Sequence, residues 1–432
     1  MRFFYTALWY LILPALFLRL WLHGRLSPAY RRRWQERLAR GYQHRLAGCV
    51  WIHAVSVGET LAAAPMIEAL LRRYPATPLL VTTTTPTGSE QLRRLFGERV
   101  HHVYWPWDVP TVLRRFFRQF QPQLVILLET ELWPNLVAQA GARAIPVVLV
   151  NGRLSQRSHR GYRLFRRLTA PMLEQFAALA VQTAEEAERF VDLGADAERV
   201  QVAGNLKFDV SLDQQVRQQA ETLRGRIAGR PVWIAASTHP GEDAIVLAAH
   251  QQIRQHHADA LLVLVPRHQE RFEEVAVDVI GSGLSLARRS RGELPGDVAV
   301  YLGDSMGELL MLYGLADVAF VGGSLVSVGG HNLLEPALWQ LPIITGPVLH
   351  NFTRVAALLD EAGAHRVVTT TSELAEEVLQ LFTAVGLRQQ MGARAAAVVA
   401  GHRGALQRHL EMLAPLWPPT PDAGSAAKDS AQ

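Results

Sequence analysis

Short apolar runs rich in β-branched residues alternate with helix-prone stretches along most of this chain of 432 residues. The runs show little polar alternation, which is typical of strands covered on both faces, as in a parallel sheet. This alternation is interrupted over the polar residues 206–230 and then resumes. Because the length also favours two domains of roughly 200 residues each, we predict two α/β domains built on doubly wound parallel sheets.

The predicted strands follow from these runs. In the first domain they are 49–56, 78–85, 101–105, 123–129, 146–151, 178–183 and 200–205. In the second domain they are 231–237, 260–266, 298–303, 318–323, 341–346 and 365–370. Ligands of doubly wound domains bind beyond the carboxyl ends of the strands, so we expect the motifs at strand ends to carry the function.

A separate apolar segment opens the chain. Residues 3–22 are apolar except for Thr6 and Arg19, and this length just spans a bilayer core of about 30 Å. Arginines follow over residues 25–45 instead of a small-residue cleavage site, which indicates a retained anchor with the rest of the chain in the cytoplasm. Pro14 and Arg19 leave open whether the segment crosses the membrane or lies in its surface.

Composition divides the chain into four parts. We predict an anchor over 1–24, a first domain over 25–206, a second domain over 207–417 and a disordered tail over 418–432. The tail is predicted from its richness in Pro, Ala and Ser. The single cysteine, Cys49, excludes an intramolecular disulfide.

The charge of the chain indicates anionic partners. Its formal net charge is +5, its pI is near 9.6, and its arginines are clustered. No helix-turn-helix, zinc-finger or RNA-binding pattern is present, so we do not expect a nucleic acid partner. The stretch 151–168 mixes six arginines with Leu164, Phe165 and Leu168. It favours contact with an anionic membrane surface or a phosphorylated lipid, and a solvated basic face is the alternative.

Three carboxylates follow first-domain strands: Glu59, Glu129 and Glu131. A carboxylate at the end of a buried strand is partly desolvated, which raises its pKa and suits it to act as a general base. Glu59 also stands near a predicted helix N-terminus, so capping of that helix is an equal alternative. Glu129 and Glu131 form an ExE pair without a third ligand, which is a weak signal for a metal, so we predict no metal site.

Turn-rich segments accumulate after the second-domain strands. Four glycines lie in the segment 320–337, namely Gly322, Gly323, Gly329 and Gly330. We expect them to let backbone amides approach an anionic, nucleotide-like ligand, toward which a helix beginning near Asn332 would point its positive end. Arg267 and His268 could bind a phosphate, and Glu335 a ribose diol. Plain turns without a ligand are the alternative.

Two common nucleotide motifs are missing from the sequence. It contains no G-x-x-x-x-G-K-[ST], and no G-x-G-x-x-G follows the first strand of either domain. The sequence therefore disfavours both nucleoside-triphosphate hydrolysis and dinucleotide redox chemistry.

Eight motifs in order resemble one known family. They are HAVSVGE (53–59), TPTGSE (85–90), ETELWPN (129–135), NLKFD (205–209), STHPGE (237–242), VPRHQERF (265–272), GDSMGELLMLYGLADVAFVGGSL (303–325) and GGHNLLEPA (329–337). Together they look like the 3-deoxy-D-manno-octulosonic acid (Kdo) transferase family of lipid A glycosyltransferases. The likeness extends from the anchor to about residue 415.

The resemblance implies a GT-B fold, in which two Rossmann-like domains face a cleft, with an acceptor-binding N-terminal domain and a CMP-sugar-binding C-terminal domain. It implies an inverting, metal-independent enzyme that moves Kdo from CMP-Kdo to a phosphorylated lipid A precursor, lipid IVA. The reaction belongs to the synthesis of the lipopolysaccharide inner core on the cytoplasmic face of the Gram-negative inner membrane. No cofactor is implied, since CMP-Kdo is the donor substrate.

The resemblance also implies roles for single residues. Glu59 matches the general base, and Glu129, in preference to Glu131, and Lys207 match groups that stabilise the transition state. The segments expected to hold CMP contain Arg267, His268, Met306, Gly307, Glu308, Asn332, Leu334 and Glu335. Two alternatives stay open: a membrane-associated GT-B transferase that uses a UDP-sugar, and a membrane-anchored protein that binds nucleotide or lipid without turnover.

Overall fold

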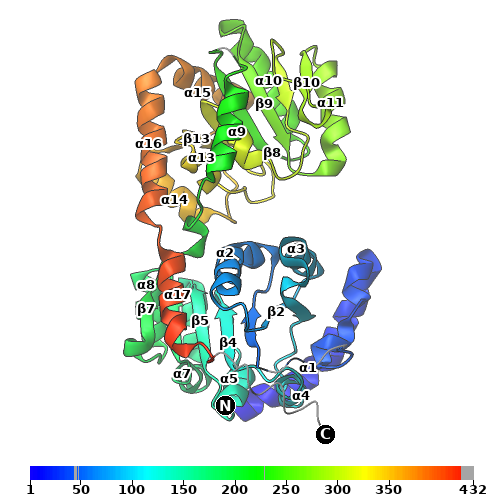
Figure 1. The fold of residues 1–432 in the computed structure, drawn as a ribbon, viewed down its shortest axis with the longest axis vertical. Helices are drawn as coiled ribbons and strands as arrows, with labels where there is room; N and C mark the ends of the chain where they lie inside the picture. The colour runs from blue at the N-terminus through cyan, green and yellow to red at the C-terminus, as the bar shows by residue number, and fades with distance from the viewer. Residues whose placement is uncertain (43–45, 47, 228, 420–432) are drawn as a thin grey trace. The chain divides into compact units, whose positions relative to one another are not determined.

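The computed structural model describes residues 1–42, 46, 48–227 and 229–419. The chain forms two compact units: Met1–Asp209 with Gly404–Gln432, and Val210–Arg403. In the described part of the chain, each unit contains one seven-stranded sheet whose neighbouring strands are all parallel. Figure 1 shows each sheet with its helices. The predicted pair of parallel α/β domains is confirmed.

The sheet of the first unit has the strand order β3-β2-β1-β4-β5-β6-β7. Its strands are β1 Val50–His53, β2 Leu79–Thr83, β3 His101–Tyr104, β4 Leu124–Leu128, β5 Val147–Gly152, β6 Ala178–Val181 and β7 Val200–Val202. Its helices are α1 Arg2–Leu26, α2 Val57–Arg73, α3 Pro86–Phe96, α4 Pro110–Phe120, α5 Pro134–Gly141, α6 Gln156–Leu164, α7 Arg166–Leu173, α8 Ala184–Asp192 and α17 Ala405–Leu413.

The sheet of the second unit has the order β10-β11-β9-β8-β12-β13-β14. Its strands are β8 Val232–Thr238, β9 Leu261–Pro266, β10 Leu286–Arg288, β11 Val300–Leu302, β12 Val318–Val321, β13 Ile343–Thr345 and β14 His365–Val367. Its helices are α9 Gln214–Arg224, α10 Glu242–His256, α11 Phe272–Gly281, α12 Leu309–Tyr313, α13 Leu334–Leu338, α14 Thr353–Glu361, α15 Thr371–Thr383 and α16 Val385–Gly401.

Every run that was predicted to be a strand contains one. The sequence analysis missed β10, an edge strand whose Leu286 pairs with Val300 of β11. Its three residues lack an apolar run, so only the pairing with β11 defines them as a strand. This is a tertiary effect that local pattern does not record.

Alternate residues of each strand enter different apolar cores. In β1, Trp51 belongs to one buried cluster, whereas Val50 and Ile52 belong to the cluster on the opposite face of the sheet. In β8, Trp233 and Ile234 are divided between two clusters in the same way. Both faces are buried because successive side chains of a strand point to opposite sides and helices cover each side.

Among the described residues, one helix, α1, is long and apolar enough to cross a membrane. In the structure, one face of α1 packs on the first unit through Trp9, Leu13, Leu16, Phe17 and Leu20. The opposite face is exposed and strongly apolar, as in Phe3, Phe4, Leu8 and Leu11. This helix, dark blue in Figure 1, therefore packs on the domain with one face and exposes the other face.

Polar contacts also hold α1 to the first unit. The Tyr5 hydroxyl donates to Asp108 Oδ2 at 2.9 Å, and Thr6 Oγ1 donates to Asn135 Oδ1 at 2.9 Å. Asp108 and Asn135 lie at the starts of α4 and α5. The predicted anchor is thus a helix that lies against the folded domain.

The predicted boundary of the second domain differs from the structure at both ends. Lys207 belongs to the first unit, and so do residues from Gly404 onward, which were assigned to the second domain. The reason lies in Asp209, whose carboxylate accepts hydrogen bonds from the Gly404 and Leu406 amides and caps α17. His409 of α17 then accepts a hydrogen bond from the Asn151 amide at 2.8 Å.

The C-terminal segment continues along the first unit. Trp417 stacks on Tyr74 with 4.3 Å between ring centroids, and Pro418 is buried. The predicted disordered tail begins at Pro418, and its residues 420–432 lie outside the described residues. Composition does not predict contacts between segments that lie so far apart in the sequence.

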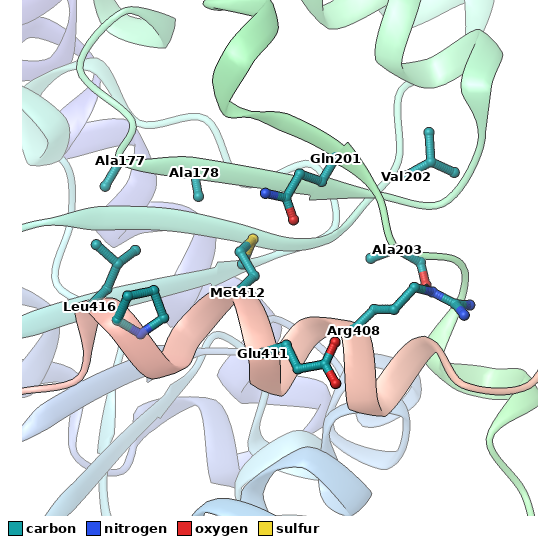
Figure 2. A pocket seen from close by; sticks show the side chains of 10 residues that line it. Ala177, Ala178, Gln201, Val202, Ala203, Arg408, Glu411, Met412 and Leu416 are labelled. Atoms are coloured by element: carbon teal, nitrogen blue, oxygen red, sulfur yellow. The ribbon is translucent and has the colours of Figure 1, made fainter.

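A pocket of about 410 Å³ lies between β7 and α17. Figure 2 shows Arg408, Glu411 and Met412 of α17 near Gln201 and Val202 of β7. Arg408 donates to the Ala203 carbonyl at 2.8 Å. None of the residues predicted to be functional lines this pocket.

Replacing Asp209 with Ala should loosen α17, because the helix loses both of its capping hydrogen bonds. Loss of a cap costs about 1 kcal/mol, which corresponds to roughly fivefold faster opening. Amide hydrogen exchange of residues 405–413 in the full chain measures this effect. Asp278→Ala, on the exposed side of α11, is the control, and equal exchange in both variants would contradict the capping role.

Candidate active site

The three predicted carboxylates of the first unit come together at one edge of its sheet. Strands β1 and β4 are parallel neighbours, so their carboxyl ends lie at the same edge. Glu59 lies in the first turn of α2, which follows β1, and Glu129 and Glu131 follow β4. The charges of Glu129 and Glu131 both act on the Glu59 carboxyl group and raise its pKa.

Glu59 is part of a helix cap. Its Oε2 accepts from the Val55 amide at 2.9 Å, and its Oε1 accepts from Ser56 Oγ at 3.2 Å. The Glu59 amide donates to Ser56 Oγ in return at 3.4 Å. This reciprocal arrangement of Ser at the N-cap and Glu three residues later resembles a capping box, with the Glu side chain bonded to the amide one residue before the N-cap. The capping interpretation is therefore confirmed, and the hydrogen bonds hold the carboxylate at the sheet edge.

Capping does not prevent Glu59 from acting as a base. Burial raises its pKa to about 7, the Val55 hydrogen bond opposes this shift, and the charges of Glu129 and Glu131 add to it. A base with a pKa near the working pH combines a large deprotonated fraction with useful basicity. The carboxylate is thus anchored and at the same time basic enough to accept a proton near neutrality.

Glu129 has a strained backbone at the end of β4. Its φ is 55°, in the left-handed region that non-glycine residues avoid. Asn151 on the adjacent strand β5 and Ser237 on β8 share this feature, with φ values of 52° and 57°. Such conformations cost about 1–3 kcal/mol each and cluster at functional sites. Sequence reasoning did not identify these strained positions, since each depends on the tertiary surroundings.

Glu131 is held by two aromatic residues of the same edge. Trp133 Nε1 donates to Glu131 Oε2 at 2.7 Å, and His53 Nε2 lies 3.3 Å from the same oxygen. His53 is completely buried and stacks on Trp105 with 3.7 Å between centroids. Trp133 also contacts Trp9 of α1. The apolar N-terminal helix therefore touches the residues that hold this carboxylate.

Lys207 lies on the 3-10 turn Leu206–Phe208, which packs against α2. The Lys207 amide donates to Asn205 Oδ1 at 2.9 Å, and the Leu206 amide donates to Asn151 Oδ1 at 3.1 Å. The turn is thus fixed to the end of β5. This arrangement places the NLKFD motif in the same unit as Glu59 and Glu129.

The basic stretch 151–168 forms two short helices rather than one amphipathic segment. Helix α6 ends at Leu164 and α7 begins at Arg166. Leu164 is 82% exposed and Phe165 is 56% exposed, and exposed arginines flank both. The stretch presents an apolar tip surrounded by positive charge.

In the second unit, the predicted nucleotide-binding segments follow adjacent strands. Arg267 and His268 follow β9, Met306, Gly307 and Glu308 follow β11, and Asn332 follows β12. The central strand order β11-β9-β8-β12 brings their carboxyl ends together. The sheet therefore gathers the three motifs at one edge.

Two histidines that the sequence analysis did not identify lie among these residues. His239 Nε2 and His331 Nε2 are 2.8 Å apart, and the rings of His239 and His268 are in edge contact at 5.1 Å. Burial lowers the pKa of His331 to about 4, with the charge of Arg267 contributing. Burial raises the pKa of Glu335, and the positive charge of Arg267 partly offsets this shift. Arg267, His268 and Glu335 thus share one electrostatic environment.

Glu242 holds the glycine loop together, and the sequence analysis missed it. This carboxylate is fully buried at the start of α10. It accepts hydrogen bonds from four backbone amides, those of His239, Gly323, Ser324 and Leu325, at 2.7–3.0 Å. A buried carboxylate is tolerated because these donors replace its hydration.

The glycines act differently from the prediction. The Gly322 amide donates to the Ala236 carbonyl, Gly323 donates to Glu242, and Gly329 and Gly330 both donate to the Gly323 carbonyl. All four amides are thus bonded to groups of the protein, so they are not the donors expected for a ligand. Gly330 has a φ of 77°, a left-handed conformation that favours glycine.

The helix expected to begin near Asn332 is present and is short. Helix α13 has five residues, so it adds only a small dipole at its N-terminus. Leu334 is 1% exposed, and its amide donates to Asn332 Oδ1. The Leu334 side chain therefore packs in the core, and Asn332 is engaged at the helix start. Asn332 Nδ2 also donates to Glu335 Oε1 at 3.0 Å.

The motif at residues 306–308 is held by an arginine that the sequence analysis missed. Arg289 donates to both oxygens of Glu308 at 2.6–3.2 Å, and these bonds lower the Glu308 pKa. Gly307 has a φ of 87°, and Met306 is 43% exposed. Within residues 1–42, 46, 48–227 and 229–419, no group of three or more His, Cys, Asp and Glu residues is arranged to hold a metal ion.

Glu242→Gln should loosen the loop 322–325. An amide side chain has one acceptor oxygen instead of two and turns N–H groups toward the loop amides. Hydrogen bonds to a charged group contribute about 1.5–3 kcal/mol each, so exchange of these amides should accelerate at least about tenfold. Glu376→Gln, on the exposed face of α15, is the control. Unchanged exchange in Glu242→Gln would show that the loop is held by other contacts.

Comparisons with known proteins agree with this architecture. A family model described as 3-Deoxy-D-manno-octulosonic-acid transferase (kdotransferase) matches residues 32–210. Among solved structures, a glycosyltransferase from Rickettsia africae ESF-5 matches with a TM-score of 0.52 and 11% identity, over 85% of this chain and 98% of that chain. That likeness confirms the GT-B fold.

Two curated relatives extend along nearly the whole chain. The 3-deoxy-D-manno-octulosonic acid transferase of Haemophilus influenzae is 41% identical over 96% of this chain and 98% of its own length. The enzyme of the same name from Bordetella pertussis is 39% identical over 85% of this chain and 87% of its own length. The chain therefore belongs to the 3-deoxy-D-manno-octulosonic acid transferase family and is a glycosyltransferase.

Proposed function

We propose that the chain transfers Kdo from CMP-Kdo to a phosphorylated lipid A precursor, lipid IVA, with inversion at the anomeric carbon and without a metal ion. The observation that carries this proposal is Glu59, an anchored carboxylate whose pKa is about 7. A sugar hydroxyl is a weak nucleophile until a base accepts its proton. Glu59 has the protonation behaviour that this reaction requires.

In the proposed reaction, the acceptor hydroxyl oxygen forms a bond to the anomeric carbon of Kdo while its proton passes to Glu59. The bond between that carbon and the CMP phosphate oxygen breaks, and CMP leaves with the electron pair. Attack opposite the leaving group inverts the configuration. Glu129 remains our candidate for stabilising positive charge that develops on the sugar, because it lies at the same sheet edge as Glu59.

Negative charge grows on the phosphate as CMP leaves. Lys207 and Arg267 are the cations proposed to stabilise it, and His268 is proposed to donate to the phosphate. Glu335 and the backbone around Met306 and Gly307 are proposed to bind the cytidine and its ribose. The roles of the second-unit residues are supported by the convergence of their three motifs at one edge of the second sheet.

We further propose that the first unit rests on the cytoplasmic face of the inner membrane. The exposed face of α1 and the apolar tip Leu164–Phe165 with its arginines support this location. A helix that packs on its domain through residues 5–20 suits a position in the membrane surface, since its other face can enter the lipid.

The direct test is transfer by the purified full-length protein, with CMP-Kdo and lipid IVA in detergent and products counted by mass spectrometry. We expect products that carry added Kdo, and their masses also give the number of residues added. Calorimetry with CMP and UDP is the companion measurement. Preferential binding of UDP, or no product under conditions in which CMP binds, would overturn the proposal.

The pH profile tests Glu59 as the base. Because the deprotonated form acts, kcat/KM should rise about tenfold per pH unit below pH 7 and level off above it. Glu129→Gln removes a charge that raises the Glu59 pKa, so the inflection should move to lower pH. Glu59→Gln should abolish the rise of kcat/KM with pH and most of the transfer rate. Glu68→Gln, on the same helix, is the control and should leave the inflection in place.

A further inference from the structure

We infer that a second pocket of the first unit binds the phosphate-bearing headgroup of a bilayer phospholipid. The pocket has a volume of about 480 Å³ and is lined by Thr111, Arg114, Arg115, Arg118 and Arg143. It shares no lining residue with the candidate active site. The inference rests on the proposed membrane position of the first unit, and it assigns a specific lipid contact to that surface.

Helix spacing explains why the arginines meet. Val112, Leu113, Phe116, Phe117 and Phe120 form the buried face of α4. The three arginines of α4 lie on its other positions and are exposed or half-buried. Residues three and four apart on a helix are neighbours, so these side chains form one basic surface.

Two of the guanidinium groups are held in place by the protein. Arg115 donates twice to the Leu38 carbonyl, at 3.2 and 2.8 Å. Arg143 donates to the backbone and side-chain oxygens of Gln139 at 2.7 and 2.8 Å, and it lies 5.1 Å over the Phe117 ring. An arginine ordered in this way loses less entropy when it binds an anion.

No carboxylate neutralises this cluster within the described part of the chain. The sequence has no acidic residue from 109 to 128 or from 132 to 173. Burial and the charges of Arg40 and Arg118 lower the pKa of Arg115. Like charges held together repel, and a bound dianion or diester would relieve that repulsion. Phosphate oxygens accept bidentate hydrogen bonds from guanidinium groups.

The pocket borders the exposed face of α1, which distinguishes a lipid from a soluble phosphate. Thr111, which lines the pocket, lies 3.1 Å from the Tyr10 hydroxyl, measured to its Oγ1. Leu11, the next residue of α1, is 78% exposed, and Leu8 is 58% exposed. A ligand with an anionic headgroup beside acyl chains satisfies both surfaces at once. A free phosphate would leave the apolar face uncovered.

Flotation of the full-length protein with vesicles tests the inference. The vesicles are pure phosphatidylcholine or phosphatidylcholine with about one fifth phosphatidylglycerol. The variant Arg114→Gln/Arg118→Gln/Arg143→Gln is compared with Arg72→Gln/Arg94→Gln/Arg226→Gln, which removes equal charge from exposed positions elsewhere. We expect the pocket variant to bind the anionic vesicles about tenfold more weakly than the control variant, with equal binding to neutral vesicles.

Further measurements distinguish this inference from the alternatives. Equal losses in the two variants would overturn the inference in favour of diffuse charge attraction. Arginine-dependent binding of inorganic phosphate, with displacement from anionic vesicles, would overturn it in favour of a soluble ligand. Arg114→Lys/Arg118→Lys/Arg143→Lys should recover part of the binding, which excludes misfolding as the cause. Kdo transfer in detergent should be equal in all variants, and its absence in the unaltered protein would contradict the proposed function but not this pocket.

Discussion

Burial of both faces of each parallel sheet decides where polar chemistry can lie in this protein. The central strands of each sheet are mostly apolar and buried along their length, and helices cover them on both sides. A polar side chain on one of these central strands can then reach solvent or a ligand only where the strand ends. The carboxyl edges accordingly hold Glu59 and Glu129 in one unit and His239, Glu242 and Arg267 in the other. Each of these residues follows a buried strand within a few positions, which explains why polar groups gather at these edges.

The same constraint explains why structural and chemical roles coincide at Glu59. Helix α2 begins at the sheet edge, where the Val55 amide and the Ser56 hydroxyl just before the helix need an acceptor. The carboxylate supplies that acceptor, and its burial beside two other carboxylates raises its pKa to about 7. The hydrogen bonds that would lower the pKa are outweighed by burial. A residue that caps a helix can therefore also be the base of a transferase.

Aromatic packing connects this edge to the N-terminal helix. Trp9 of α1 contacts Trp133, which in turn donates a hydrogen bond to Glu131 beside His53. The helix that is proposed to enter the lipid is thus part of the same packed region as the carboxylates. This contiguity suits the lipid acceptor that we propose, because acceptor and helix would share one membrane surface.

The sequence by itself determined the class of fold, the strand positions and the edge motifs, because local apolar pattern reflects burial directly. Tertiary structure decided the rest. Strand β10 depends on pairing with β11, and α17 joins the first unit through Asp209 and Asn151. The glycine amides bind to groups of the protein instead of a ligand. The arginines at 114–118 and at 143 become a pocket only when α4 and the end of α5 pack together. Each of these features arises from contacts between residues far apart in the chain, whose geometry a linear pattern does not contain.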